Sequence, residues 1–206
     1  MSRPSSALTK NLITHLESLN KTRVKMENLF NKKSLSRRDV EKSYEALYLR
    51  TTTFFEGFIE ELFFGLLTKR IYPVSSDVIA RVDLKSDLVA RDIVFAGKPY
   101  IDWFPYTRTV DLAEIYFRGG RPFTFLDGQD IAEIKNIMII RNVIAHQSAH
   151  SLGLFQKVIL SNNHGLLPSE KTAAGFLRSQ FRVSPIQTRL ELYQLRIIGM
   201  AKKIAG

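Results

Sequence analysis

Three side chains near the end of one predicted helix have the types and the spacing that metal-free phosphate chemistry requires. The segment IIRNVIAHQSAH contains Arg141, Asn142 and His146. In a helix, Asn142 and His146 lie one turn apart on the same face, and Arg141 projects about 100° away from Asn142 around the axis. A guanidinium can bind a phosphate through two hydrogen bonds, and an imidazole can accept or donate a proton near neutral pH. These three are therefore the candidate catalytic residues.

The same residues also have a structural interpretation. Arg141 could cap the carbonyl groups of a neighbouring element, and His146 could be a hydrogen-bonded core histidine. His150 adds an H-x-x-x-H spacing that could bind zinc from one helix face. No acidic residue lies between the two histidines and the chain has no Cys, so a third ligand would have to be His15, His164 or a distant carboxylate. We therefore predict no metal site, and we interpret His150 as an exposed residue at the helix end.

The helix that carries these residues has clear sequence signals. Asp127 is a suitable N-cap, and Asp130 adds negative charge in the first turn. A stripe of apolar residues at helical spacing follows, formed by Ile131, Ile134, Ile137, Met138 and Ile144. The helix is predicted to run from Gly128 to about Ser148.

Three further helices are predicted around it. Apolar residues recur at helical spacing over residues 5–31, and the basic turn NKKSLSRRD follows, with Ser36 as an N-cap. A second long helix is predicted to continue until Pro73, on a stripe formed by Val40, Tyr44, Leu47, Thr51, Phe55, Phe58, Leu62 and Leu66. The segment QTRLELYQLRIIGMAKKIA is predicted to form the last helix.

The region between these helices is less regular. Short helices are predicted near 76–90 and 108–117, and prolines and a Gly-Gly pair divide a long aromatic-rich connector. VFAGKPYIDWF is compatible with a β-hairpin, and a loop rich in Ser, Asn and Gly is expected before the last helix. The sequence therefore predicts an all-α bundle with short intervening helices, formed as a single domain over residues 1–206.

The composition excludes several classes of protein. The chain has 206 residues, of which 45% are hydrophobic and 24% are charged, and these values are typical of a globular protein. The absence of Cys excludes disulfide scaffolds, thiolate zinc sites and Cys nucleophiles. No secretory signal is visible in MSRPSSALTK, and the apolar stretch FFEGFIEELFFGLL is too short to span a membrane. We therefore expect a cytoplasmic protein without a membrane partner.

Positive charge is concentrated toward the two ends of the chain. The net charge is +10, and residues 1–50 carry 11 basic and 5 acidic residues, while residues 151–206 carry 8 and 2. A surface of this kind suits a phosphate backbone, although ordinary solvated side chains explain the charge equally well. The candidate backbone contacts are a compact cluster and a Gly-Gly loop, and they comprise Lys32, Lys33, Arg37, Arg38, Arg118 and Arg121.

Acidic and aromatic residues supply two further candidates. Glu56 and Glu60 share a helix face among phenylalanines, where carboxylates invite a buried partner such as Arg141, although a solvated face is the simpler explanation. Nucleobases could stack on four aromatic residues of the connector, which are Tyr100, Trp103, Phe104 and Tyr106. Packing in the core or in a dimer is the expected role of these four residues.

The hexapeptide RNVIAH resembles the R-N-x-x-x-H signature of the HEPN superfamily, which consists of small helical bundles and includes many metal-independent ribonucleases. The segments YLRTTTFFEGFIEELF and LLPSEKTAAGFLRS…TRLELYQL are also similar to bacterial HEPN proteins, in particular to the RiboL-PSP-type group. The resemblance covers the chain from about Val40 to Ala205. It implies a HEPN-like bundle and a homodimer in which the motif helices of two protomers face each other across a two-fold axis.

The resemblance also implies a role for each motif residue. Arg141 would hold the scissile phosphate and stabilise the charge that develops on its oxygens, and Asn142 would position His146 or the phosphate. His146 would act as general acid/base when a ribose 2′-OH attacks the adjacent phosphate. The implied substrate is RNA, because DNA lacks the 2′-OH.

The function that follows from the resemblance is an endoribonuclease that needs no metal or other cofactor. Its implied role is that of a toxin or an effector of defence or stress response, with an antitoxin or defence-system protein as a partner. Ser148 stands where toxins controlled by a nucleotidyltransferase antitoxin often carry Tyr, which argues against that mode of control. Two alternatives stay open, namely a non-catalytic RNA- or nucleotide-binding module and a protein-interaction subunit with a structural Arg141/His146 pair.

Overall fold

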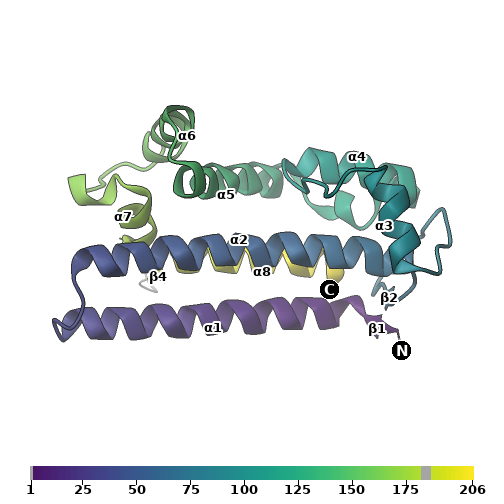
Figure 1. Ribbon diagram of the computed structural model, residues 1–206, viewed down its shortest axis with the longest axis horizontal. Coiled ribbons are helices and arrows are strands. Elements are labelled where there is room, and N and C mark those ends of the chain that lie inside the picture. Colours follow the sequence, from purple (N-terminus) through teal and green to yellow (C-terminus); the bar gives the residue numbers. More distant parts are fainter. Residues whose placement is uncertain (1, 182–186) are drawn as a thin grey trace. The chain divides into compact units, whose positions relative to one another are not determined.

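Helices account for most of the chain in the computed structural model, which describes residues 2–181 and 187–206 (Figure 1). The α-helices of these ranges are α1 (Ser5–Asn31), α2 (Arg37–Leu67), α3 (Asp87–Phe95), α4 (Tyr106–Tyr116), α5 (Gly128–His146), α6 (Ala149–Leu154), α7 (Ala173–Arg178) and α8 (Arg189–Ala205). The predicted all-α class is confirmed. Within the described ranges, no helix combines the length and the apolar character that crossing a membrane requires.

Short elements connect the helices. Three are 3-10 turns, namely η1 (Arg118–Gly120), η2 (Phe123–Phe125) and η4 (Pro168–Glu170), and η3 (Phe155–Leu160) has π-helical hydrogen bonding. β1 (Arg3–Pro4) pairs in parallel with β2 (Ile71–Tyr72). β3 (Gln180–Phe181) pairs antiparallel with β4 (Gln187–Thr188).

The chain divides into two compact units, which we call unit 1 and unit 2. Unit 1 consists of the residues up to 13, of residues 55–135 and of residues 198–206, and unit 2 consists of residues 14–54 and 136–197. Four helices, α1, α2, α5 and α8, therefore contribute residues to both units.

An aromatic cluster forms the core of unit 1. The ring of Phe63 on α2 lies 5.2 Å from the ring of Trp103, 5.2 Å from that of Phe117 and 5.6 Å from that of Phe123, measured between centroids. All four side chains are buried. The aromatic connector predicted between the helices is therefore part of a core and packs on the apolar end of α2.

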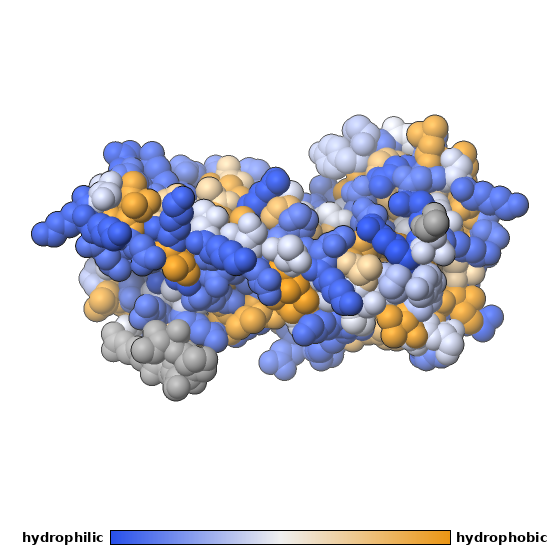
Figure 2. Space-filling view, turned by 90° about the horizontal axis from the view of Figure 1, so that it is seen from below, coloured by the Kyte–Doolittle hydropathy of each residue, from blue (hydrophilic) through white to orange (hydrophobic). Residues whose placement is uncertain are grey.

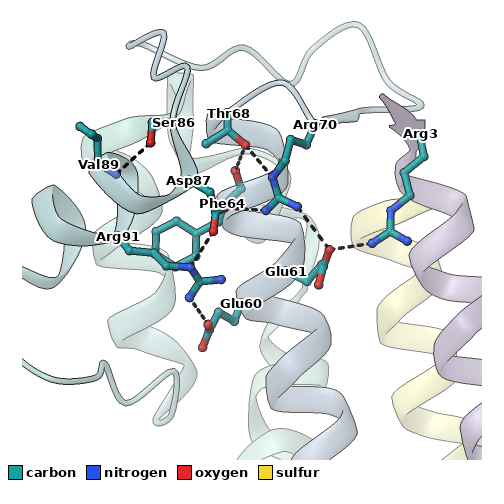
Figure 3. Close-up of polar contacts among 10 residues, drawn as sticks. All are labelled: Arg3, Glu60, Glu61, Phe64, Thr68, Arg70, Ser86, Asp87, Val89 and Arg91. Atoms are coloured by element: carbon teal, nitrogen blue, oxygen red, sulfur yellow. Dashed lines mark hydrogen bonds and ion pairs between the residues drawn. The ribbon is translucent and has the colours of Figure 1, made fainter. Parts of the chain in front are cut away.

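A network of charged side chains surrounds the end of α2 in unit 1 (Figure 3). Its members are Arg3, Glu60, Glu61, Arg70, Asp87 and Arg91. Asp87 accepts from Arg70 at 2.6 Å and from Arg91 at 2.9 Å. Burial tends to raise the pKa of Asp87, but the hydrogen bonds and charges of the two arginines outweigh burial and lower it. The network links α2 to α3 and to β1.

Unit 2 is a bundle of helical segments. Its parts of α1 and α2 run antiparallel on either side of the turn over residues 32–36 (Figure 1). The hydroxyl of Tyr48 on α2 donates to the carbonyl of Ile137 on α5 at 3.1 Å, and the amide of Gln194 on α8 donates to Oγ1 of Thr51 at 3.2 Å. These buried hydrogen bonds hold α5 and α8 against α2 in this unit.

The stripe predicted for α2 is confirmed, but the predicted end of this helix is wrong. All eight stripe residues are buried. The start is capped as expected, because the backbone N–H of Asp39 donates to Oγ of Ser36 at 3.2 Å. The helix ends at Leu67 and not at Pro73, since Ile71 and Tyr72 leave the helical conformation to pair with β1.

Other predicted boundaries in unit 1 need correction. The helix predicted near 76–90 begins only at Asp87, where Oγ of Ser86 accepts from the backbone of Val89 at 3.4 Å. The hairpin predicted for VFAGKPYIDWF is not formed, because α3 continues to Phe95 and ends at Ala96, whose φ of 50° is left-handed. The helix predicted near 108–117 corresponds to α4.

The prediction of a loop between α5 and the last helix is also wrong in part. The segment contains α6, η3 and α7. Each of these three elements has only six residues, too few for a recognisable apolar period. The last helix begins at Arg189, two residues later than predicted, because Gln187 and Thr188 form β4.

Candidate active site

Helix α5 carries the candidate catalytic residues on its last two turns. Oδ1 of Asp127 fixes its start by accepting from two backbone N–H groups of the first turn, at 2.9 and 3.0 Å, as predicted for an N-cap. The apolar side of its second half is buried through Ile137, Ile140, Val143 and Ile144. Arg141 and Asn142 are half-buried, and His146 is exposed.

Arg141 brings the three candidate residues together. Its Nη1 atom lies 3.1 Å from Oδ1 of Asn142 and 3.1 Å from Nε2 of His146. A guanidinium can only donate, so this contact is a hydrogen bond in the tautomer whose Nε2 is unprotonated. An imidazole with an unprotonated Nε2 is the form that can act as a general base.

The guanidinium of Arg141 is available to a ligand. Among residues 2–181 and 187–206, no carboxylate forms an ion pair with Arg141, and no hydrogen bond involves its Nε or Nη2 atoms. Two such donors match two oxygens of a phosphate. The site can therefore hold an oxyanion beside an exposed proton acceptor.

His150 does not share a helix with His146, so the H-x-x-x-H spacing does not place the two histidines on one helix face. α5 ends at His146, because Gln147 has a left-handed φ of 46°. Ser148 is not the last residue of α5 but the N-cap of α6, and its Oγ accepts from the backbone of Ser151 at 3.1 Å. His150 is exposed, near the start of α6. The described residues contain no group of three or more potential metal ligands of the types His, Cys, Asp and Glu.

The basic cluster of the α1–α2 turn is exposed and lies in unit 2, as the candidate active site does. Arg37 is engaged, because its Nε pairs with Glu41 at 2.6 Å and its Nη2 donates to the carbonyl of Ser169 at 3.2 Å. In the described part of the chain, no carboxylate pairs with the other three members, Lys32, Lys33 and Arg38. These three side chains leave positive charge in solvent.

The other two candidate backbone contacts belong to unit 1. Arg121 pairs with Asp77 at 2.9 Å, and its guanidinium lies 5.8 Å from the ring centroid of Phe125. Arg118 is exposed in η1. Arg121 is therefore held by local contacts, whereas Arg118 extends from the surface of unit 1.

The acidic candidates also lie in unit 1. Glu60 accepts hydrogen bonds from Arg91 and, at 3.1 Å, from Nε1 of Trp103. The partner of Glu60 is thus Arg91 and not Arg141. Glu56 is half-buried on the same helix. Glu60 has a structural role, because it connects α2 to α3 and to the aromatic core.

The aromatic residues of the connector follow the expectation of packing in three of four cases. Trp103, Phe104 and Tyr106 are buried, and the hydroxyl of Tyr106 donates to the carbonyl of Phe123 at 3.0 Å. Base stacking on these three residues is excluded in this arrangement. Tyr100 is 66% exposed and is the member that a base could reach.

Two polar features of unit 2 were not predicted from the sequence. A cavity of about 610 Å³ is lined in part by Arg178 and Glu27, which form a two-pronged pair, and by Tyr44, which donates to Glu27 at 2.9 Å. Burial raises the pKa of Tyr44 to about 12.

A smaller cavity is lined by Arg189, which is buried at the start of α8. The capping pattern T-x-x-E over residues 188–191 was the available sequence signal for this helix start.

Polar side chains cover most of the face shown in Figure 2, and apolar residues form small separate patches there. In comparisons with known proteins, no family model, no curated protein and no solved structure matches the chain.

Proposed function

We propose that this chain is a metal-independent endoribonuclease of HEPN type that acts as a homodimer. The observation that carries the proposal is the contact of 3.1 Å between Nη1 of Arg141 and Nε2 of His146, at an exposed helix end. The contact places a phosphate-binding group beside a proton acceptor, and the resemblance of RNVIAH to the HEPN signature supports the same assignment. A role as a toxin or as an effector of defence or stress response belongs to this proposal and rests on the resemblance alone.

The proposed reaction is transfer of the phosphate to the neighbouring 2′-oxygen of the RNA. In this reaction the hydrogen bond from Nη1 of Arg141 to Nε2 of His146 breaks, and Nε2 takes the proton of the 2′-OH. The 2′-oxygen then bonds to phosphorus, and the bond from phosphorus to the 5′-oxygen breaks. The products are a 2′,3′-cyclic phosphate and a 5′-hydroxyl end. Arg141 stabilises the negative charge on the phosphate oxygens through its Nε and Nη2 donors.

A second protomer completes the proposed site. One chain offers one imidazole at this position, while the reaction uses a base for the 2′-OH and an acid for the leaving 5′-oxygen. His146 of a second copy would supply that acid if the ends of the two α5 helices faced each other. We therefore expect a dimer at micromolar concentration, and sedimentation of a monomer that still cleaves RNA would refute the composite site.

The test is cleavage of a labelled RNA in the presence of EDTA. His146→Ala should lose about 10²–10⁴-fold in cleavage rate while RNA binding and melting temperature stay close to wild type. Arg141→Lys should restore little activity, because an ammonium cannot form the planar two-pronged contact. His164→Ala is the matched control, since His164 is an exposed histidine outside the site. A folded His146→Ala variant that cleaves RNA at the wild-type rate would refute the assignment.

The exposed basic cluster favours one alternative, an RNA-binding module without catalysis. Lys32, Lys33 and Arg38 can contact a phosphate backbone whether or not cleavage follows. Replacing all three by Ala should reduce the log–log salt slope of RNA binding by up to about 0.7 for each contact with a single strand. Arg37→Ala is the comparison variant, because Glu41 already neutralises Arg37. Salt-dependent binding without any cleavage would favour the alternative.

A further inference from the structure

A small cavity in unit 2 is lined by a buried arginine that forms no ion pair with any carboxylate in the described part of the chain. Its volume is about 190 Å³. Segments of α5, η3, α7, β3 and α8 line it, and the lining residues that matter here are Asn136, Asn162, Asn163, Phe176, Phe181 and Arg189. No acidic residue lines this cavity, so its lining is positively charged.

Two aromatic rings and one hydrogen bond hold the side chain of Arg189 in place, but they do not neutralise its charge. It is 8% exposed, and its guanidinium lies 4.7 Å from the ring centroid of Phe176 and 4.6 Å from that of Phe181. Its Nη1 donates to Oγ of Ser179, but its buried Nε has no hydrogen-bond partner among residues 2–181 and 187–206. No carboxylate of the described residues forms an ion pair with Arg189. A desolvated charge with an unsatisfied donor is costly unless a ligand completes it.

Arg189 lies at an unfavourable position in its helix for a positive charge. It is the first residue of α8, a helix of 17 residues. Thr188 caps this helix, because its Oγ1 accepts from the backbone N–H of Glu191 at 3.3 Å. A cation is unfavourable at the N-terminal end of a helix, where the dipole is positive. The carboxylate of Glu191 already lies at this helix end, where it accepts from the backbone N–H of Thr188 at 2.8 Å. The buried guanidinium of Arg189 is therefore the group that favours an anion in the cavity.

We propose that the cavity binds one phosphoryl group, with Arg189 as its main contact. Ligand pockets for drug-sized molecules usually have about 300–1,000 Å³, so this cavity is too small for a whole nucleotide and large enough for a tetrahedral oxyanion. The phosphoryl group can come from inorganic phosphate or from the end of a phosphate ester whose remainder stays outside. This site is distinct from the one at Arg141, and it requires no RNA cleavage.

Titration with inorganic phosphate at pH 7 tests the proposal, with ionic strength held constant by NaCl. A ligand that binds only the folded state raises its melting temperature. We therefore expect the melting temperature to rise with phosphate concentration above its value in NaCl alone at the same ionic strength. The NMR signal of the Arg189 Nε–H should shift and saturate with the same dissociation constant. Competition by adenosine monophosphate would identify an ester as the source, and its failure to compete would identify free phosphate.

Variants separate this site from other anion sites on the surface. Arg189→Met retains an unbranched side chain between the two rings and should weaken the binding of phosphate by at least about tenfold. It should not lower the melting temperature without phosphate, because it removes an unpaired buried charge. Asn136→Asp is the second variant, and it should also remove the response, because it adds a carboxylate to the lining. Arg108→Gln is the control, since Arg108 is an exposed arginine of unit 1.

Two results would overturn the proposal. One is the absence of a saturable phosphate effect beyond that of NaCl. The other is an undiminished response in a folded Arg189→Met variant, because phosphate would then bind elsewhere, for example at Arg141. If Arg189→Met does not fold, an undiminished response of Asn136→Asp has the same consequence.

Discussion

Replacing Glu27 by Gln measures what the ion pair beside the larger cavity contributes to stability. Nε and Nη2 of Arg178 donate to the two oxygens of Glu27 at 2.8 and 2.9 Å, and the hydroxyl of Tyr44 donates to the same carboxylate. The side chains of Arg178 and Glu27 are 21% and 23% exposed. Glu27→Gln retains the shape of the side chain and removes its charge, so Arg178 loses its counter-ion.

The expected loss lies between two known limits. Exposed ion pairs contribute about 0–1 kcal/mol to the free energy of unfolding, while breaking a fully buried pair costs about 3–5 kcal/mol. A pair that is about four-fifths buried should therefore cost about 2 kcal/mol. In a chain of 206 residues such a loss lowers the melting temperature by about 4–8 °C. Glu41→Gln is the control, because its partner Arg37 is 53% exposed, and it should cost less than about 0.5 kcal/mol.

The same pair predicts a dependence on pH. Burial tends to raise the pKa of Glu27, but the hydrogen bond and charge of Arg178 and the hydroxyl of Tyr44 outweigh burial and lower it. A lowered pKa stabilises the folded state above the pKa of the unfolded chain, about 4.3. This stabilisation disappears as the pH falls through the folded-state pKa. The difference between wild type and Glu27→Gln, measured by urea denaturation, should thus be largest near pH 7 and shrink below about pH 4. A difference under 0.5 kcal/mol, roughly the error of such measurements, or one that does not change with pH, would refute this reasoning.

Four other substitutions have expected effects on urea denaturation. Gly65→Ala would place a Cβ 2.2 Å from the side chain of Ile71 and should destabilise the fold by about 1–3 kcal/mol, whereas Gly57→Ala on the same helix meets no heavy atom of another element within 4 Å and should stabilise it by up to about 1 kcal/mol. Equal effects at both positions would contradict the close approach. Asp127→Ala removes the N-cap of α5 and should cost about 1 kcal/mol. Tyr48→Phe should cost a similar amount, because it removes a buried hydrogen bond to the backbone of α5.

The long helices were predictable because their apolar residues repeat with the helical period. Each residue of the α2 stripe is buried. The end of α2 was not predictable in the same way, since it depends on the pairing of Ile71 with Arg3, a partner 68 residues away in the sequence. The hairpin expected near Trp103 failed for a similar reason. Trp103 in this segment packs against Phe63 of α2, in an aromatic core that only the folded chain brings together.

The candidate active site was predictable in its composition and only partly in its geometry. The spacing of Asn142 and His146 indicated a shared helix face, but the contact between Arg141 and His146 depends on how the long arginine side chain crosses the helix end. The predicted end of α5 near Ser148 was wrong because Ser148 caps the start of a new helix, which carries His150. The burial of Arg189 was not predictable, because a charged residue near a helix start is ordinarily exposed. Its burial depends on the aromatic rings of Phe176 and Phe181.

Each unit consists of separate segments of the sequence, so neither unit corresponds to one continuous stretch of the gene. The boundaries fall after residues 13, 54, 135 and 197, and each of them lies inside a helix. A single uninterrupted coding segment therefore cannot encode unit 2 alone, and a cut at any boundary would divide a helix between two fragments. Recombination that exchanges intact coding segments, or a laboratory transplant that copies one, would have to carry both units together. The candidate active site and the aromatic core are thus inherited as one genetic module.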